Sequence, residues 1–159
     1  MQIQVVAVGK IKEKYLAIGI AEYTKRLGPF SRLEIHEVKD EKIPDGASPA
    51  EEAAILDKEA SRLEALIKPG TYLIALAING RTFSSEEFAA RIDTLATTGR
   101  SHITFVIGGS LGLSPRLTVQ ADLCLSFSPM TFPHQLFRLL LLEQIYRAFK
   151  INHGEPYHK

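Results

Sequence analysis

Five apolar runs of strand length alternate with five helical patterns along the chain. The strand-like runs, recognised by period-two or continuous apolar residues, cover residues 2–8, 31–38, 71–77, 102–107 and 122–127. The helical patterns cover residues 12–27, 48–67 and 84–99, a short stretch after Ser114-Pro115, and residues 133–150. Strands that alternate with helices in this way predict an α/β fold, with a mostly parallel sheet flanked by helices.

Two of the helical patterns begin with a strong local signal. Ser48 and Ser84 are each followed three residues later by a glutamate, which is the capping-box pattern. Pro49 adds the residue that is favoured at the first helical position. These signals predict helix starts at residues 49 and 85.

The length and composition fit one globular domain. The chain has 159 residues, of which 45% are hydrophobic and 23% charged, close to ordinary globular usage. A domain of this length buries roughly 70% of its unfolded surface, which is ample for a core without staples. We therefore expect residues 1–159 to form a single domain. The single cysteine, Cys124, excludes an internal disulfide and is expected to be a packed thiol rather than a nucleophile.

No targeting or membrane signal is visible. The N-terminal residues lack a basic segment followed by a long apolar stretch, and no apolar run approaches the ~20 residues that span a bilayer. We therefore expect a soluble, cytoplasmic protein with no membrane segment. The net charge is only +1, so no bulk attraction to nucleic acid is expected. Residues 131–159 hold four basic groups, two acidic groups and three of the five histidines, and a polyanion is most expected there.

Three loops that follow strand-like runs are the candidate ligand site. They are ALAING after the third run, IGGSLGL after the fourth and SFSPMTFPH after the fifth. Ligands of open α/β sheets sit outside the carboxyl ends of the strands, where these loops begin. Gly108 and Gly109 follow the fourth run directly and let the backbone approach a ligand closely, although a plain tight turn needs the same residues.

Several nucleotide and metal motifs are absent. G-x-G-x-x-G follows neither the first nor the fourth strand-like run, and the phosphate-cradling G-x-x-x-x-G-K-[ST] does not occur. A hydride-transferring enzyme or an ATPase is therefore disfavoured. Cys124 has no nearby His or Cys at ligand spacing, so we expect no metal. The apolar loop 126–135 could instead hold a flat purine ring through main-chain hydrogen bonds, or it could only cap the helix that starts near Pro133.

The last helical pattern carries polar groups on opposite sides. At about 100° per residue, His134 and Arg138 lie near one direction, with Glu143 and Arg147 almost diametrically across. Two apolar stripes run between them, although a surface helix needs only one. Burial from a second direction predicts a second copy of the chain in a two-fold dimer.

The residues after this helix, INHGEPYHK, are unusual for a terminal segment. Without a partner such a segment is a disordered end. If it folds back over the strand-end loops, His158 supplies an imidazole, the side chain that titrates near neutrality, and Tyr157 supplies a phenol donor.

Four stretches together resemble one known family: VVAVGKIKEKYL, FVIGGSLGL, LSFSPMTFPHQLFRLLLLEQIYRAFKI and the final GEPYHK. The chain is similar over its whole length to the ribosomal RNA large subunit methyltransferase H family, within the SPOUT superfamily. The resemblance implies a homodimer, S-adenosylmethionine as cofactor and a C-terminal deep trefoil knot, a feature that is nearly absent from proteins. Carried over residue by residue, the cofactor contacts fall on Leu76, Gly108, Phe127, Ser128, Pro129, Met130, Thr131 and Phe132.

The same resemblance implies a substrate, which is pseudouridine-1915 in helix 69 of 23S rRNA, methylated at N3 on the assembled 70S ribosome. N3 is an imide nitrogen whose lone pair becomes available when its proton leaves, so a base is expected. His158 is the first candidate for that base or a proton relay, with Tyr157 orienting or stacking on the target base. Arg147 could stabilise the anionic oxygens or bind phosphate, or it could only pair with Glu143 along the helix.

Two alternatives to this activity stay open at the level of sequence. One is a non-catalytic ribosome-binding module of the same fold. The other is a SPOUT methyltransferase that acts on tRNA. Binding of S-adenosylmethionine separates the first alternative from an enzyme, and the identity of the methylated RNA separates the second.

Overall fold

The computed structural model describes residues 1–159 and confirms the alternation of strands and helices. The elements are β1 (Gln2–Val8), α1 (Lys14–Leu27), β2 (Arg32–Val38), α2 (Pro49–Glu64), β3 (Tyr72–Thr82), α3 (Ser85–Thr97), β4 (His102–Ile107), α4 (Pro115–Gln120), β5 (Leu123–Ser126) and α5 (His134–Asn152). The boundaries lie close to those predicted, except that β3 continues well beyond residue 77.

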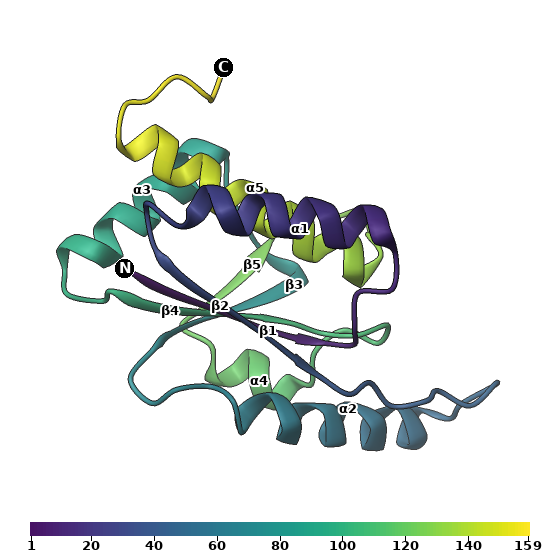
Figure 1. The fold of residues 1–159 in the computed structure, drawn as a ribbon. Coiled ribbons are helices and arrows are strands. Elements are labelled where there is room, and N and C mark those ends of the chain that lie inside the picture. Colours follow the sequence, from purple (N-terminus) through teal and green to yellow (C-terminus); the bar gives the residue numbers. More distant parts are fainter.

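All five strands are parallel, in the order β2-β1-β4-β3-β5. Helices α1, α3 and α5 cover one face of this sheet, and α2 and α4 cover the other (Figure 1). Helix α5 packs against both α1 and α3. The predicted parallel sheet flanked by helices is therefore confirmed.

The central strand β1 is buried on both faces. Ile3, Val5 and Ala7 pack into the larger core with α3 and α5, whereas Val6 and Val8 pack into a smaller core with α2 and α4. Side chains alternate between the faces of a strand, so a strand covered on both sides reads as a nearly continuous apolar run. This explains why residues 5–8, VVAV, are apolar without interruption.

The helix starts at α2 and α3 follow the predicted capping boxes. The Ser48 hydroxyl oxygen accepts a hydrogen bond from the backbone N–H of Glu51 at 3.1 Å, and Ser84 accepts one from Glu87 at 3.0 Å. Each glutamate carboxylate accepts the reciprocal bond from the serine backbone N–H. These bonds satisfy N–H groups that the first turn of a helix otherwise leaves without a partner.

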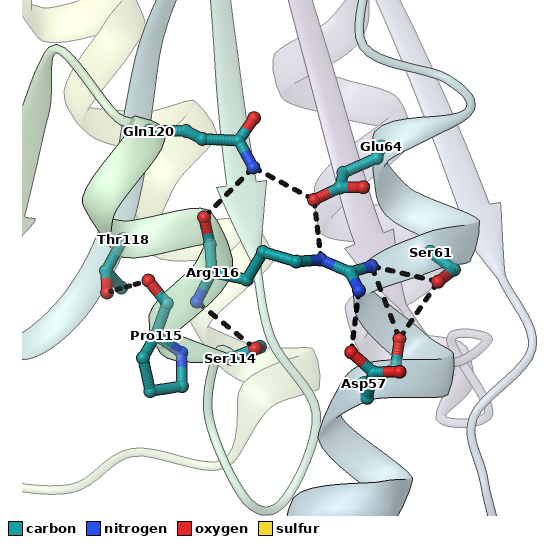
Figure 2. Close-up of polar contacts among 8 residues, drawn as sticks. All are labelled: Asp57, Ser61, Glu64, Ser114, Pro115, Arg116, Thr118 and Gln120. Carbon is teal, nitrogen blue, oxygen red and sulfur yellow. Dashed lines mark hydrogen bonds and ion pairs between the residues drawn. The ribbon is translucent and has the colours of Figure 1, made fainter.

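Helix α4 is short and is held against α2 by one arginine. Arg116 donates to Glu64 at 2.9 Å, to Asp57 at 2.6 Å and to the Ser61 hydroxyl at 2.8 Å, as Figure 2 shows. Gln120 donates to the same Glu64 oxygen at 3.0 Å. Because a six-residue helix has little stability of its own, these contacts fix the position of the chain directly after the glycine turn that follows β4.

Helix α5 carries near its start a buried arginine that pairs with an exposed glutamate. The side chain of Arg138 is 2% exposed, forms an ion pair with Glu37 at the end of β2, and donates to the Gly9 carbonyl oxygen at 3.0 Å. Glu37 also accepts from the backbone N–H of Ile11 at 3.1 Å. Of the three guanidinium nitrogens of Arg138, only Nε lacks a hydrogen-bond partner. This network ties the first turns of α5 to the carboxyl ends of β1 and β2.

None of the five helices combines the length and apolar character that a membrane span requires. Cys124 is half-buried in β5, where its thiol lies 3.5 Å from the Thr118 carbonyl oxygen, as expected for a packed thiol.

Glu37→Ala is expected to destabilise the fold by about 3–5 kcal/mol, because it leaves the buried guanidinium without a counter-charge. Adding Arg138→Met should recover part of that loss, since the double variant buries no unpaired charge. Chemical denaturation of both variants measures the difference. Asp45→Ala, an exposed position with no ion pair, is the control and should stay within about 0.5 kcal/mol of the parent. A double variant that is less stable than Glu37→Ala would contradict this account.

Candidate active site

The carboxyl ends of β4, β3 and β5 lie side by side, because these strands are parallel neighbours in the sheet. Leu76 is buried in β3 opposite Leu125 of β5. Gly108 follows β4 directly, and residues 127–132 follow β5 directly. The structure therefore gathers all the predicted cofactor residues at one edge of the sheet.

Strand β3 differs from the prediction at this edge. Its register with β5 shifts between Leu76 and Arg81, so residues 77–80 leave the ladder before Arg81 and Thr82 pair with β5 again. Gly80 is required there, since a Cβ atom would lie 2.7 Å from the carbonyl of Cys124. ALAING is thus an excursion within a strand rather than the loop at its end. The reason is pairing with β5, which is a tertiary contact that local periodicity does not report.

The turn after β4 is built from glycines. A Cβ atom on Gly108 would lie 2.2 Å from the Gly112 carbonyl oxygen, and Gly112 itself has a φ of +80°. The Gly112 N–H donates to the Gly109 carbonyl at 3.0 Å and closes the turn. Residues 108–112 also match the G-x-S-x-G pattern of a nucleophile elbow, but Ser110 is exposed and makes no hydrogen bond to a histidine or an acid. The turn therefore brings two backbone segments close together and carries no catalytic triad.

Residues 127–132 form a loop whose backbone is available to a ligand. None of its N–H or C=O groups takes part in a backbone hydrogen bond within the chain. The Met130 N–H donates to the Ser128 hydroxyl at 3.0 Å, and Ser126 lies within hydrogen-bond distance of the Ile78 and Ser128 carbonyls. Met130 is exposed. The loop thus offers main-chain donors and acceptors, the groups that recognise the edge of a purine.

Two aromatic side chains anchor this loop to α5. Phe127 and Phe132 pack on Phe137, with ring centroids 4.7 Å and 6.2 Å away. Phe132 is half-buried, in contact with Phe137 of α5. A cavity of about 170 Å³ lies beside Phe127, between the start of α3 and Gln144 of α5. This cavity is smaller than pockets for drug-sized ligands, which measure about 300 Å³ or more, and of the predicted cofactor residues only Phe127 lines it.

The terminal residues form a second cluster on the other side of α5. Tyr157 donates to the Glu143 carboxylate at 3.1 Å and lies 3.4 Å from the hydroxyl of Tyr23 in α1. The Arg147 guanidinium stacks over the Tyr157 ring at 4.8 Å and donates from Nε to Glu143 at 3.0 Å. The structure therefore brings Arg147, Tyr157 and His158 together, and the terminal segment folds back on its own chain.

Hydrogen bonds define the tautomer of His158. Its Nδ1 lies 3.1 Å from Arg147 Nη1, and its Nε2 lies 2.8 Å from the Glu86 carboxylate of α3. Arginine can only donate, so Nδ1 carries the lone pair and Nε2 carries the proton that is donated to Glu86. Hydrogen bonds from its own backbone N–H and from His158 lower the pKa of Glu86, which keeps it a carboxylate. The basic nitrogen of His158 is thus the one that faces Arg147.

Tyr157 is held in its protonated form. Burial, followed by the hydrogen bond to Tyr23 and the charge of Glu143, raises the pKa of Tyr157 well above that of a free phenol. The hydrogen bond to Glu143 likewise raises the pKa of Arg147. At neutral pH this cluster therefore contains a phenol donor, a permanent cation and the imidazole of His158.

The loop and the terminal cluster lie at different levels of α5. Phe137, which holds the loop, precedes Arg147, which holds His158, by ten residues. Ten helical residues span about 15 Å, whereas reacting atoms must approach to about 3–3.5 Å. No hydrogen bond joins His158 to residues 127–132 within the chain, although the cavity beside Phe127 also borders Ser85, the neighbour of the Glu86 that pairs with His158.

The family follows from comparison with known proteins. A model described as "Predicted SPOUT methyltransferase" matches residues 1–158. The ribosomal RNA large subunit methyltransferase H of Carboxydothermus hydrogenoformans is 57% identical over 159 residues, and that of Streptococcus thermophilus is 56% identical, with 100% of both chains covered in each case. The chain belongs to the ribosomal RNA large subunit methyltransferase H family. The resemblance identified from the sequence is thereby confirmed.

Two solved structures share the fold of this chain at low sequence identity. A probable methylase family protein from Haemophilus influenzae gives a TM-score of 0.53 at 14% identity, covering 99% of this chain and 70% of that one. A probable methyltransferase from Bordetella pertussis gives 0.55 at 19% identity, covering 92% and 95%. At such identities the likeness concerns the fold alone.

Several residues of this SPOUT chain lie in the terminal cluster although sequence reasoning missed them. The sequence indicates Glu143 only as a helical partner of Arg147, and it gives no signal for Glu86. Tyr23 was not considered. The four-residue spacing of Glu143 and Arg147 is visible in the sequence, but nothing local connects Tyr23 or Glu86 with residues more than 70 positions away.

A buried carboxylate beside the glycine turn was also missed. Glu59 of α2 is 5% exposed and accepts a hydrogen bond from the Glu41 backbone N–H at 3.0 Å. Its Oε1 lies 3.6 Å from the position that a Cβ atom on Gly109 would occupy. Burial raises the pKa of Glu59, and no cation is paired with it. A side chain of this type is more often found on the solvent face of a helix, so its position on α2 carried no signal.

No group of three or more His, Cys, Asp or Glu side chains is arranged to hold a metal ion.

Glu59→Gln is expected to stabilise the protein at pH 8. A carboxyl whose pKa is raised by folding contributes stability below its unfolded pKa and loses that stability as pH rises through the folded value. Glutamine carries no charge and can still accept from Glu41, so the variant should be more stable than the parent at pH 8, and this gain should shrink towards pH 4. Denaturation at both pH values measures it, with the exposed Asp93→Asn as control. A gain that is equal at both pH values would contradict the burial argument.

Proposed function

We propose that this chain is an S-adenosylmethionine-dependent methyltransferase that modifies N3 of pseudouridine-1915 in helix 69 of 23S rRNA, on the assembled 70S ribosome. The observation that carries the proposal is the convergence of Leu76, Gly108 and residues 127–132 at one sheet edge of a chain that belongs to this family. A ribosomal substrate also places the protein in the cytoplasm. Residues 1–159 act as a single SPOUT methyltransferase domain in this proposal.

The residues present fit the cofactor. The backbone of 127–132 has unused hydrogen-bonding groups for the purine edge, and the turn at Gly108 leaves no Cβ atom to block a close approach. The relatives from Carboxydothermus hydrogenoformans and Streptococcus thermophilus are named as methyltransferases. When bound, S-adenosylmethionine supplies an electrophilic methyl group on a sulfonium. Ser128, Pro129, Met130, Thr131 and Phe132 would hold it together with Phe127, Leu76 and Gly108.

The terminal cluster has the groups that the imide proton requires. The target nitrogen becomes nucleophilic when its proton is removed, and His158 Nδ1 carries an available lone pair. Arg147 donates an N–H to that lone pair. The N–H of the imide would donate to the same lone pair. In our proposal the substrate takes this place and Arg147 turns its donors to the anionic oxygens. Tyr157, kept protonated, orients the base by donation or by stacking.

A two-fold dimer would bring the halves of the site together. No hydrogen bond joins the loop of one chain to its own His158, and their anchors on α5, Phe137 and Arg147, are ten residues or about 15 Å apart along the helix. In our proposal the partner's terminal segment completes the site. Tyr15 and Ile18 on α1 are 66% and 70% exposed, as large apolar side chains of a protein interface are in the free subunit. Leu136 and Leu140 on the neighbouring α5 are only half-buried. These side chains support an interface made by α1 and α5.

The deep trefoil knot is also part of this proposal. Strand β5 follows β4 and α4 in the chain, yet it pairs with the edge of β3. Helix α5 then returns to the face of the sheet opposite α4, where it packs between the other helices. Close backbone approaches at Gly80 and Gly108 occur where segments would pass one another. An experimental chain trace that ran outside the loop formed by β3, α3 and β4 would reject the knot.

The test of the function has two parts. Titration calorimetry should find S-adenosylmethionine bound with micromolar or better affinity, and absence of binding would instead favour a non-catalytic ribosome-binding module. Labelled methyl should then be transferred to 70S ribosomes that lack the modification, more than to free 50S subunits. Transfer to free tRNA, without transfer to ribosomes, would favour the tRNA enzyme and overturn the proposed substrate.

Two inactive variants should complement each other if the site is composite. Deletion of residues 157–159 removes the proposed base, and Gly108→Val disrupts the cofactor turn because its Cβ cannot be accommodated. Each variant alone should lose methyl transfer, and the truncated one should still bind S-adenosylmethionine. Mixed in equal amounts after dissociation, they should regain roughly a quarter of the parent activity, because half of the dimers carry one intact site.

Thermal melting of each variant verifies that it is folded before mixing. Mixtures that stay inactive although mixed dimers form would show that each chain uses its own terminal segment. Full activity of the truncated protein by itself would remove His158 and Tyr157 from the catalytic assignment.

A further inference from the structure

Free positive charge is concentrated in two short segments. Five of the eight lysines that form no ion pair lie in segments 10–14 and 39–42, and all five are exposed. They are Lys10, Lys12, Lys14, Lys39 and Lys42. Seven of the nine arginines, in contrast, are neutralised by carboxylates. A net charge of +1 therefore conceals a local excess of cations.

Both segments leave the sheet at the edge that carries the candidate active site. They follow β1 and β2, which are parallel neighbours, and the Gly9 N–H donates to the Val38 carbonyl at 2.8 Å where the two segments begin. Strand β1 is in turn the neighbour of β4. The lysines therefore lie beside the turn at Gly108, on the flank away from β5.

The first segment is held rigidly against the start of α5. The Ile11 N–H donates to Glu37, and the Lys12 N–H donates to the Gln135 side chain at 3.0 Å. Burial alternates along 10–12, since Ile11 is half-buried and both lysines are exposed. Gln135 stands three residues after the loop 127–132. The ammonium groups of Lys10 and Lys12 are thus presented next to the proposed cofactor loop.

Nearby carboxylates do not cancel this charge. Glu37 is paired with Arg138, and Glu41 with Arg62. The acids without an ion pair in or beside the two segments are Glu13, Asp40 and Asp45, against five lysines. A cationic surface whose lysines form no ion pair, and of which one segment is held rigidly, is suited to bind a polyanion.

We infer that Lys10, Lys12, Lys14, Lys39 and Lys42 form a phosphate-contacting surface that holds the ribosomal RNA beside the reacting pseudouridine. The inference rests on the proposed function and extends it to the way in which the substrate is gripped. Lysine acts on phosphate as a point charge, so such contacts position the RNA without reading its sequence. A chain with little net charge thereby attracts RNA electrostatically only at the surface where the RNA must bind.

The test compares two matched double variants. Lys10→Gln/Lys12→Gln removes two charges from the surface, and Lys25→Gln/Arg91→Gln removes two charges without an ion pair on α1 and α3. Binding to 70S ribosomes is measured by co-sedimentation over a range of salt concentrations, and S-adenosylmethionine binding is measured by calorimetry. Removing one lysine that touches a phosphate should reduce the slope of log K against log salt by about one.

The surface variant should bind ribosomes about tenfold or more weakly at low salt, with a slope reduced by about two and unchanged cofactor affinity. The control variant should match the parent. Equal weakening in both variants, or no weakening in either, would overturn the inference. Because binding is measured without methyl transfer, a parent that binds ribosomes through these lysines but methylates another RNA would refute the proposed substrate alone.

Discussion

The arrangement of the C-terminal region depends on the ion pair and the hydrogen bond that the buried Arg138 forms. Its guanidinium joins Glu37 of β2 and the Gly9 carbonyl after β1 to the second turn of α5. A charge buried to this degree is tolerated only with a partner and hydrogen bonds, so the position of α5 along the sheet is closely specified. The loop 127–132 precedes this anchor, and the helix that carries Glu143 and Arg147 follows it. One ion pair therefore places both halves of the proposed site.

The proposed chemistry is divided between two structural environments. The cofactor side consists of backbone at the ends of parallel strands, where glycines permit close approach and the sheet keeps the loops in register. The proton-transfer side consists of side chains, in which Glu86 selects the tautomer of His158 and Glu143 orients Arg147 and Tyr157. No hydrogen bond links the two environments within one chain, which is why the proposed function includes a dimer.

Much of the fold could be predicted from periodicity and local signals. Apolar runs located the strands, and the serines at positions 48 and 84 located two helix starts through bonds that form within one turn. The excursion at residues 77–80 could not be predicted, since it depends on pairing with β5. The burial of Arg138 and Glu59 could not be predicted either, because arginine and glutamate are mostly exposed and their partners lie on other elements.

The sequence by itself determined the order of strands and helices, the candidate loops at the strand ends and, through its motifs, the family. Those properties rest on local periodicity, capping and residue type. The tertiary structure decided which loops meet, which nitrogen of His158 carries a lone pair, and where uncompensated lysines gather. Each of these depends on contacts between segments far apart in the chain, such as Glu86 with His158 or Lys12 with Gln135. Folding alone creates those contacts, so no pattern within a single segment could report them.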